Sequence, residues 1–286
     1  MRYESPESVE GAVALLSAAT GEARVLAGGT DLLVQMRADV VDPDLIVDIK
    51  KIAETRAITE EKGGWRIGAA VTGAELKEHP RLKSVWPGVI EAANLIGSTQ
   101  VQGRATLGGN LCNGSPAADS VPALIAAGAL ASLAGPQGRR DLPVEDVMLG
   151  PRKLALRKGE IVVSFLLPPR PPRSSDAYLR FIPRTEMDIA VVGAGVSLTL
   201  DGAGTITAAR VGLGAVAARV LLVAEAAQAI IGSRLDLPAQ QRLEAAARAA
   251  CRPIDDKRGT IEFRTDVAAV LTRRAALIAL DRARTS

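Results

Sequence analysis

Two short segments combine paired glycines with small polar side chains, a pattern that leaves backbone N–H groups open to a phosphate oxygen. The first is Ala27-Gly28-Gly29-Thr30-Asp31, at the end of a predicted strand over Arg24–Ala27. Glycine has no side chain to obstruct an approaching oxygen, and the Thr30 hydroxyl adds a donor. A glycine pair at a strand end also suits an ordinary tight turn, so this segment alone identifies no ligand.

The second segment runs from Thr106 to Asp119 and repeats this chemistry with more small polar residues. We expect its part from Thr106 to Pro116 to be a glycine-rich loop. Asp119 could accept hydrogen bonds from ligand hydroxyl groups, or cap the predicted helix over Pro122–Leu130, a role worth about 1 kcal/mol. Because each segment could hold one end of a pyrophosphate, a dinucleotide is the leading ligand.

A third glycine pattern favours a different cofactor. Gly212-Leu213-Gly214-Ala215-Val216-Ala217 follows a predicted strand and matches G-x-G-x-x-A, with Asp236 about twenty residues later. No parallel strand is predicted between the helices over Val220–Ile231 and Pro238–Cys251, so the βαβ unit is incomplete. A stand-alone NAD-dependent dehydrogenase that uses the Gly212–Gly214 loop therefore stays as an alternative function.

Composition removes several other classes of site. The 286-residue chain has a net charge of +3, two cysteines (Cys112 and Cys251) and one histidine. These residues cannot complete a Cys/His ligand set for zinc or an iron–sulfur cluster, so we expect no metal on this chain and place any metal chemistry on a partner. We expect both cysteines to be reduced and buried. No P-loop, nucleophile elbow or H-E-x-x-H pattern is present, which leaves an oxidoreductase component.

The same composition bears on location. The basic residues are scattered, which argues against nucleic acid as a partner. No apolar run approaches the ~18 residues of a membrane span, and the N-terminus lacks the pattern of a secretory signal. We expect a cytoplasmic protein.

Alternating strands and helices are expected to position the glycine segments. The predicted helices alternate with strands, which indicates an α/β arrangement. One helix is capped by Ser5-Pro6, one begins at a capping box of Thr72 and Glu75, and one covers Glu91–Ile96. Those strands are predicted over 24–27, 45–49, 65–69 and 161–167. Pro168–Arg173 is the linker candidate. Beyond it, a sheet precedes helices: strands over 177–182, 190–200 and 206–211, then helices over 220–231, 238–251 and 265–283.

At four motifs the sequence closely resembles one family. They are Ala27–Asp31 with Met36; Thr106-x-Gly108-Gly109-Asn110 followed by Pro116-x-x-Asp119; Phe181-x-x-Arg184-x-x-x-Asp188-Ile189-Ala190; and Arg258-Gly259-Thr260-x-x-Phe263-Arg264 leading to Arg273-Arg274-Ala275. In this order and spacing they resemble the FAD-binding medium subunits of the molybdenum hydroxylases, the family of carbon monoxide and xanthine dehydrogenases. The resemblance runs the full length of the chain.

The resemblance implies an α+β fold. An FAD-binding domain of the vanillyl-alcohol-oxidase (PCMH) type would occupy residues 1–170, in two subdomains with a break near residue 55. An α+β domain of antiparallel sheet and helices would follow over 174–286. The implied cofactor-binding residues are Val25, Leu26, Ala27, Gly28, Gly29, Thr30, Asp31, Leu32, Ile96, Thr106, Leu107, Gly108, Gly109, Asn110, Asp119, Val162 and Arg180. No side chain of this chain need act as a catalytic acid or base.

The resemblance also implies a place in a larger enzyme. The large subunit of such a complex oxidises substrate at a molybdopterin centre, and two [2Fe–2S] clusters on a small subunit pass electrons to FAD. From FAD they would reach NAD, quinone or oxygen, and two heterotrimers would pair. The chain alone would not act on substrate. A cofactor-free assembly protein is the third alternative, and the presence of Gly28, Gly29, Gly108, Gly109 and Asp119 argues against it.

Overall fold

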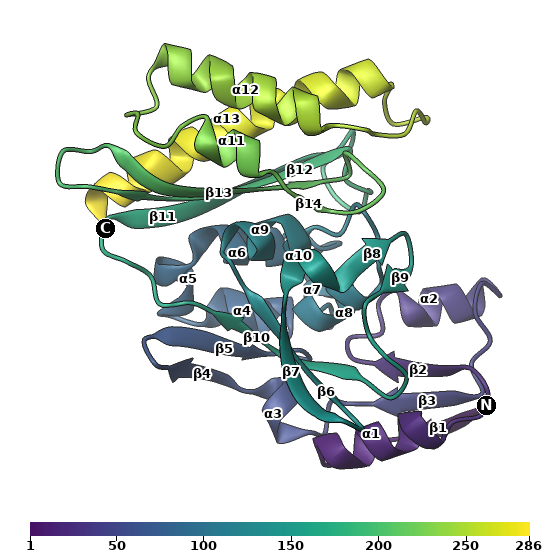
Figure 1. Cartoon of the computed structure of the whole chain (residues 1–286). Helices are drawn as coiled ribbons and strands as arrows, with labels where there is room; N and C mark the ends of the chain where they lie inside the picture. The colour runs from purple at the N-terminus through teal and green to yellow at the C-terminus, as the bar shows by residue number, and fades with distance from the viewer.

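The computed structural model describes residues 1–286, which form alternating layers of sheet and helix (Figure 1). At the N-terminal end, a small parallel sheet has the strand order β1-β3-β2, and helix α1 packs against it. Strand β2 lies at one edge of this sheet, and its end leads through Gly28–Asp31 into helix α2. These elements are β1 (Arg2–Glu4), α1 (Val9–Ala18), β2 (Ala23–Leu26), α2 (Leu32–Arg37) and β3 (Leu45–Asp48).

A five-stranded antiparallel sheet follows, with the order β4-β5-β10-β6-β7. Its strands are β4 (Ile58–Glu61), β5 (Gly64–Gly68), β6 (Leu130–Gly135), β7 (Gly138–Pro143) and β10 (Ile161–Leu167). Short helices and one small ladder connect them: α3 (Ala53–Arg56), α4 (Gly73–Glu78), α5 (Leu82–Val85), α6 (Pro87–Ala93), α7 (Thr99–Gln102), α8 (Leu107–Cys112), α9 (Ser120–Ala126), α10 (Val144–Val147), β8 (Met148–Gly150) and β9 (Lys153–Leu154).

The C-terminal part is a four-stranded antiparallel sheet between two helical layers (Figure 1). Helices α13 and α11 contact one side of it and α12 packs against these two helices, whereas α6 and α9 contact the sheet from the other side. Because both sides are covered, β12 is buried along almost its whole length, and the last four residues of β13 are buried as well. These elements are β11 (Ser174–Phe181), β12 (Val192–Leu200), β13 (Ile206–Gly214), β14 (Leu221–Leu222), α11 (Ala224–Gln228), α12 (Leu237–Ala250) and α13 (Ile261–Thr285). The expected α+β class is confirmed.

Several predicted elements are wrong in kind or in extent. The segment predicted as a glycine-rich loop contains helix α8, because the Thr106 hydroxyl accepts a hydrogen bond from the Gly109 N–H at 2.9 Å and caps it. The N-cap of α1 is Ser8 rather than Ser5. The hairpin of β6 and β7 was not predicted, and most of the helix expected over 220–231 is replaced by β14 and the short α11. The capping box of Thr72 and Glu75 is confirmed.

The alternative based on the G-x-G pattern is wrong, because Gly212 and Gly214 lie inside strand β13 and not in a loop. A Cβ atom at Gly212 would lie 2.2 Å from the Pro122 carbonyl oxygen, and one at Gly195 on β12 would lie 2.7 Å from the same atom. The glycines therefore let α9 approach the sheet closely. Packing explains the pattern that resembled a dinucleotide fingerprint.

Buried polar contacts join the two parts of the chain. The Asp176 carboxylate, which is 2% exposed, accepts hydrogen bonds from Arg170 at 2.9 Å and from the Val89 N–H at 3.1 Å. Arg282 of α13 donates to the Asp176 carbonyl oxygen at 2.9 Å and pairs with Glu91 of α6. Each buried charge thus has a partner, as burial of an ion requires.

A second buried pair crosses the same junction. Arg180 of β11 donates to Asp119 Oδ2 at 3.0 Å and to the Leu95 carbonyl oxygen at 2.6 Å. Asp119 does not cap α9 as predicted, because its side chain faces Arg180 and makes no capping hydrogen bond. Burial raises the pKa of Asp119 to about 6, and the Arg180 charge only partly offsets it.

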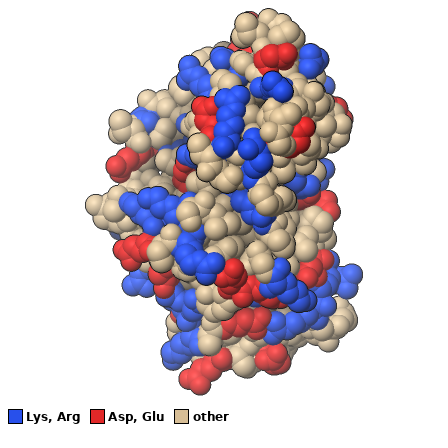
Figure 2. Space-filling model, turned by 90° about the vertical axis from the view of Figure 1, so that its left-hand side faces the viewer, with Lys and Arg blue, Asp and Glu red and all other residues tan.

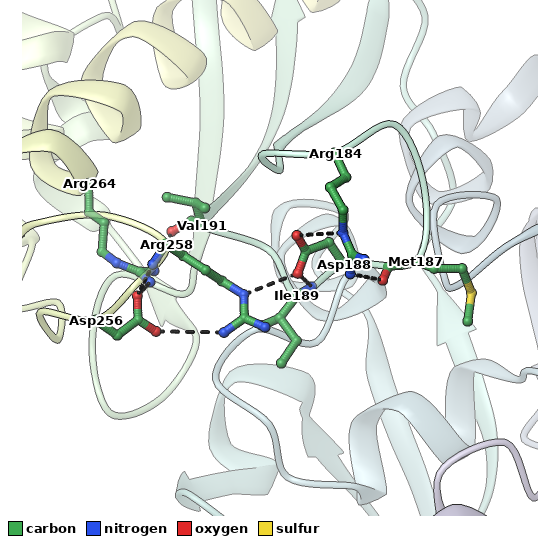
Figure 3. Close-up of polar contacts among 8 residues, drawn as sticks. All are labelled: Arg184, Met187, Asp188, Ile189, Val191, Asp256, Arg258 and Arg264. Atoms are coloured by element: carbon green, nitrogen blue, oxygen red, sulfur yellow. Dashed lines mark hydrogen bonds and ion pairs between the residues drawn. The ribbon is translucent and has the colours of Figure 1, made fainter.

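Two of the family-like motifs meet in space although they lie far apart in sequence (Figure 3). Asp188 pairs with Arg184 at 3.2 Å and with Arg258 at 3.1 Å. Arg264 donates to the Val191 carbonyl oxygen at 2.9 Å and pairs with Asp256 at 2.6 Å. These contacts tie the segment that follows Arg180 to the start of α13.

The surface carries both charges. Acidic and basic side chains are interspersed on the face in Figure 2, without the single basic stripe of a nucleic-acid-binding surface. No helix combines the length and the apolarity needed to cross a membrane.

Replacing Gly212 tests the packing role of the glycines in β13. We expect Gly212→Ala to lower the free energy of unfolding by about 1–3 kcal/mol, because the new methyl group meets backbone that cannot move aside. Gly202→Ala is the matched control, since nothing lies within 4 Å of a Cβ at Gly202 in the β12–β13 hairpin. Urea denaturation of both variants measures the difference. Equal stability of the two variants would show that α9 does not need this glycine.

The raised pKa of Asp119 predicts a dependence of stability on pH. The folded chain holds this proton more tightly than the unfolded chain, so the stabilisation is complete below about pH 4 and is lost as the pH rises through about 6. Relative to Asp119→Asn, which mimics the protonated side chain, the wild-type free energy of unfolding should fall by roughly 2–3 kcal/mol between pH 4 and pH 7.5. Urea titrations across that range measure it; parallel pH profiles would contradict the shifted pKa.

Candidate functional site

The two glycine segments meet at a cavity of about 390 Å³. Its walls come from the edge strand β2, the start of α2, helix α8, the β8–β9 ladder and the start of β10 (Figure 1). A volume in this range is typical of sites for cofactors and other small molecules. The parallel sheet and the five-stranded sheet thus each bring one glycine segment to a shared space.

The first segment presents unused donors to this cavity. The backbone N–H groups of Gly28–Asp31 donate to no acceptor within the chain, although all these residues line the cavity. Gly29 has φ of 79°, a left-handed conformation that favours glycine. A Cβ at Gly28 would lie 2.0 Å from the Arg104 carbonyl oxygen, so only glycine fits there. Consecutive free N–H groups of this kind form a concave site for an anion.

The second segment contributes a fixed amide. Asn110 Oδ1 accepts hydrogen bonds from the Ser120 N–H at 2.9 Å and the Ser120 hydroxyl at 2.7 Å. Because the oxygen is occupied, the Asn110 NH₂ group remains free to donate, and Asn110 lines the cavity. Gly108 allows α8 to lie against the backbone of Ala69, the residue that follows β5, since a Cβ there would be 2.5 Å from the Ala69 carbonyl oxygen.

The structure brings most of the predicted site residues together. The predicted residues that line the cavity are Val25, Ala27, Gly28, Gly29, Thr30, Asp31, Leu32, Ile96, Thr106, Gly108, Gly109, Asn110 and Val162. Leu26 and Leu107 are buried beside it and do not line it. Asp119 and Arg180 also lie outside the lining, in the buried pair at the domain junction.

Several lining residues had no signal in the sequence. Arg152 of the β8–β9 turn has φ of 58°, and its guanidinium group makes no hydrogen bond or ion pair within the chain. Gln35 donates to Asn113 at 2.8 Å, and both residues line the cavity. Cys112 is exposed and lines the cavity, contrary to the expectation of burial, whereas Cys251 is buried. The further lining residues are Ala23, Arg24, Val40, Val41, Ile49, Ala69, Ala105, Leu154, Leu156, Glu160 and Ile161.

This lining fits FAD. Free N–H groups at Gly28–Asp31 suit a pyrophosphate, and apolar walls that include Leu154, Ile161 and Val162 suit aromatic rings. One buried oxygen outside this lining, Asp119 Oδ1, has no hydrogen-bond partner within the chain. The structure contains no group of three or more His, Cys, Asp or Glu residues able to hold a metal ion.

Comparison with known proteins points the same way. Residues 1–170 match the family model described as the FAD binding domain in molybdopterin dehydrogenase, and residues 177–279 match the CO dehydrogenase flavoprotein C-terminal domain. The carbon monoxide dehydrogenase medium chain of Afipia carboxidovorans is 35% identical over 273 residues, which cover 96% of this chain and 94% of that protein. The xanthine dehydrogenase FAD-binding subunit of Escherichia coli O157:H7 is 31% identical over 274 residues, covering 95% and 93%.

Solved structures agree over the whole chain. Reconstituted CO dehydrogenase from Oligotropha carboxidovorans has a chain with a TM-score of 0.94 and 35% identity, covering 99% of this chain and 98% of that one. Quinoline 2-oxidoreductase from Pseudomonas putida 86 has a chain with a TM-score of 0.90 and 27% identity, with the same coverage. Together with the two family matches, these similarities show that the chain belongs to the family of FAD-binding medium subunits of the molybdenum hydroxylases.

Proposed function

We propose that this chain binds FAD in the cavity between its glycine segments and forms the electron exit of a heterotrimeric molybdenum hydroxylase. The observation that carries the proposal is the row of free N–H groups at Gly28–Asp31 in a cavity of about 390 Å³. Gly28, Gly29 and Thr30 are half-buried, and consecutive N–H groups without an acceptor in the chain form a concave site that suits an anionic ligand. The family of the chain identifies that ligand as FAD.

The site residues divide into two groups in this proposal. Val25 to Leu32 and Thr106 to Asn110 hold the pyrophosphate and adjoining parts of FAD, with the Asn110 NH₂ group as a further donor. Ile96 and Val162 contact the flavin from the cavity wall. Asp119 accepts from a cofactor hydroxyl through its free Oδ1 atom, and Arg180 holds the carboxylate in place. FAD supplies the redox chemistry when bound, and the chain supplies position and electrostatics.

The wider assignments rest on the family. The medium chain and FAD-binding subunit names of the relatives support partners: a small subunit with [2Fe–2S] clusters and a large molybdopterin subunit, in a cytoplasmic complex whose heterotrimers pair. Electrons would leave through FAD to NAD, quinone or oxygen. We also propose that residues 1–170 and 174–286 are its two domains, with a subdomain break near residue 55.

Titration of the full chain, freed of flavin, tests the proposal. We expect one FAD per chain, a flavin absorption band, and no oxidation of any substrate without the partner subunits. Gly29→Ala should weaken FAD binding by at least about tenfold, because the methyl group and the altered backbone disturb donors to the phosphates.

Gly63→Ala is the matched control for this titration. Gly63 has the same φ of 79° but lies in the β4–β5 turn, where the nearest atom to a Cβ is 3.7 Å away. Both variants therefore meet the same backbone strain, and only Gly29→Ala changes the cavity. Failure of the wild-type chain to bind FAD would overturn the proposed function. Equal affinities of the two variants for FAD would show that the cofactor does not bind at the first glycine segment.

A further inference from the structure

The Lys50 side chain binds the backbone immediately after the end of strand β2. The Leu26 carbonyl oxygen accepts a hydrogen bond from the Ile49 N–H at 3.1 Å, which is the last backbone contact between this strand end and β3. One residue later, the Ala27 carbonyl oxygen accepts from Lys50 Nζ at 3.1 Å. The Lys50 ammonium group therefore holds a carbonyl oxygen that the ladder between β2 and β3 does not use, immediately before the first glycine segment.

Because the peptide group is planar, the contact between Lys50 and the Ala27 carbonyl also fixes the direction of the Gly28 N–H. The chain has no cis peptide bonds, so the Ala27 carbonyl and the Gly28 N–H point in opposite directions from one planar unit. Holding the carbonyl oxygen toward Lys50 turns the Gly28 N–H away from Lys50. That N–H has no acceptor within the chain, and Gly28 lines the cavity.

Lys50 is itself held in place. Its Nζ atom lies 2.8 Å from Asp48 Oδ2, and Asp48 also accepts from the Lys50 N–H at 2.9 Å and from the Tyr3 hydroxyl. Burial acts to raise the pKa of Asp48, but the hydrogen bonds from Lys50 and Tyr3 outweigh it and lower that pKa below its ordinary value. The carboxylate is therefore ionised and neutralises the ammonium group, so orientation rather than net charge is what Lys50 adds.

We propose that Lys50 is a positioning residue for the pyrophosphate: it fixes the Ala27–Gly28 peptide plane so that the Gly28 N–H points at the phosphates. The residue does not line the main cavity; it lies on the other side of the glycine segment, in a small polar pocket with Arg56 and Arg104. This inference rests on the proposed binding of FAD. Its distinguishing consequence is that Lys50 matters only for ligands that carry the pyrophosphate.

Binding to the flavin-free full chain tests this role with FAD, ADP and riboflavin as probes. Lys50→Met should weaken both FAD and ADP on the order of tenfold, and leave riboflavin within about twofold, because riboflavin has no phosphate. Lys50→Arg should recover most of the loss, since it keeps a donor and the charge. Lys51→Met is the matched control: Lys51 is exposed and makes no hydrogen bond, so its loss changes only the local charge.

Lys50→Met leaves the buried Asp48 without its cation, so the variant is also tested together with Asp48→Asn. The double variant should regain thermal stability but not ADP affinity. Two results would overturn the positioning role. The Lys50→Met variant could bind ADP as tightly as Lys51→Met does, or its affinities for riboflavin and ADP could fall by the same factor. If the wild-type chain bound neither FAD nor ADP, the proposed function itself would fail, which is a separate outcome.

Discussion

A backbone N–H group that loses water and gains no acceptor is costly, and this requirement governs the structure around Gly28–Asp31. The segment leaves β2 at the open edge of a parallel sheet, so its donors find no neighbouring strand. Two other contacts hold the segment in place: Lys50 donates to the Ala27 carbonyl oxygen, and the Arg104 backbone packs against Gly28. The chain thus preorganises donors that have no partner within it, and preorganisation reduces the entropy lost on binding.

The opposite wall depends on packing between sheets and helices. Thr106 caps α8, Gly108 lets that helix lie against the Ala69 backbone, and Ser120 fixes the Asn110 amide. Ser120 and Asp119 are consecutive, so the start of α9 serves both the cavity and the domain junction. Through Arg180, the C-terminal sheet holds Asp119 and the Leu95 carbonyl. The C-terminal domain therefore supports the site without lining the cavity.

Sequence reasoning found the parts of this architecture that depend on local chemistry. The strand over 161–167, the Thr72–Glu75 capping box and the two glycine segments of the cavity wall follow from patterns within a few residues. The misses depend on distant partners. Gly212 looked like a loop glycine because the contact that requires glycine there, with the Pro122 backbone, is made by another element. Likewise, Arg152 and Lys50 carry no motif, and only the fold brings them to the glycine segments. Helix α8 escaped detection because glycines weaken the helical pattern.

Amide hydrogen exchange of the full chain with and without FAD tests directly whether the N–H groups of Gly28–Asp31 bind the cofactor, because it reports on those groups themselves. We expect saturating FAD to slow exchange strongly in peptides covering Gly28–Asp31. Peptides covering the Lys62-Gly63 turn, which also has positive φ, should stay unchanged. Unchanged exchange at Gly28–Asp31 with FAD bound would contradict it, since the pyrophosphate would then lie elsewhere.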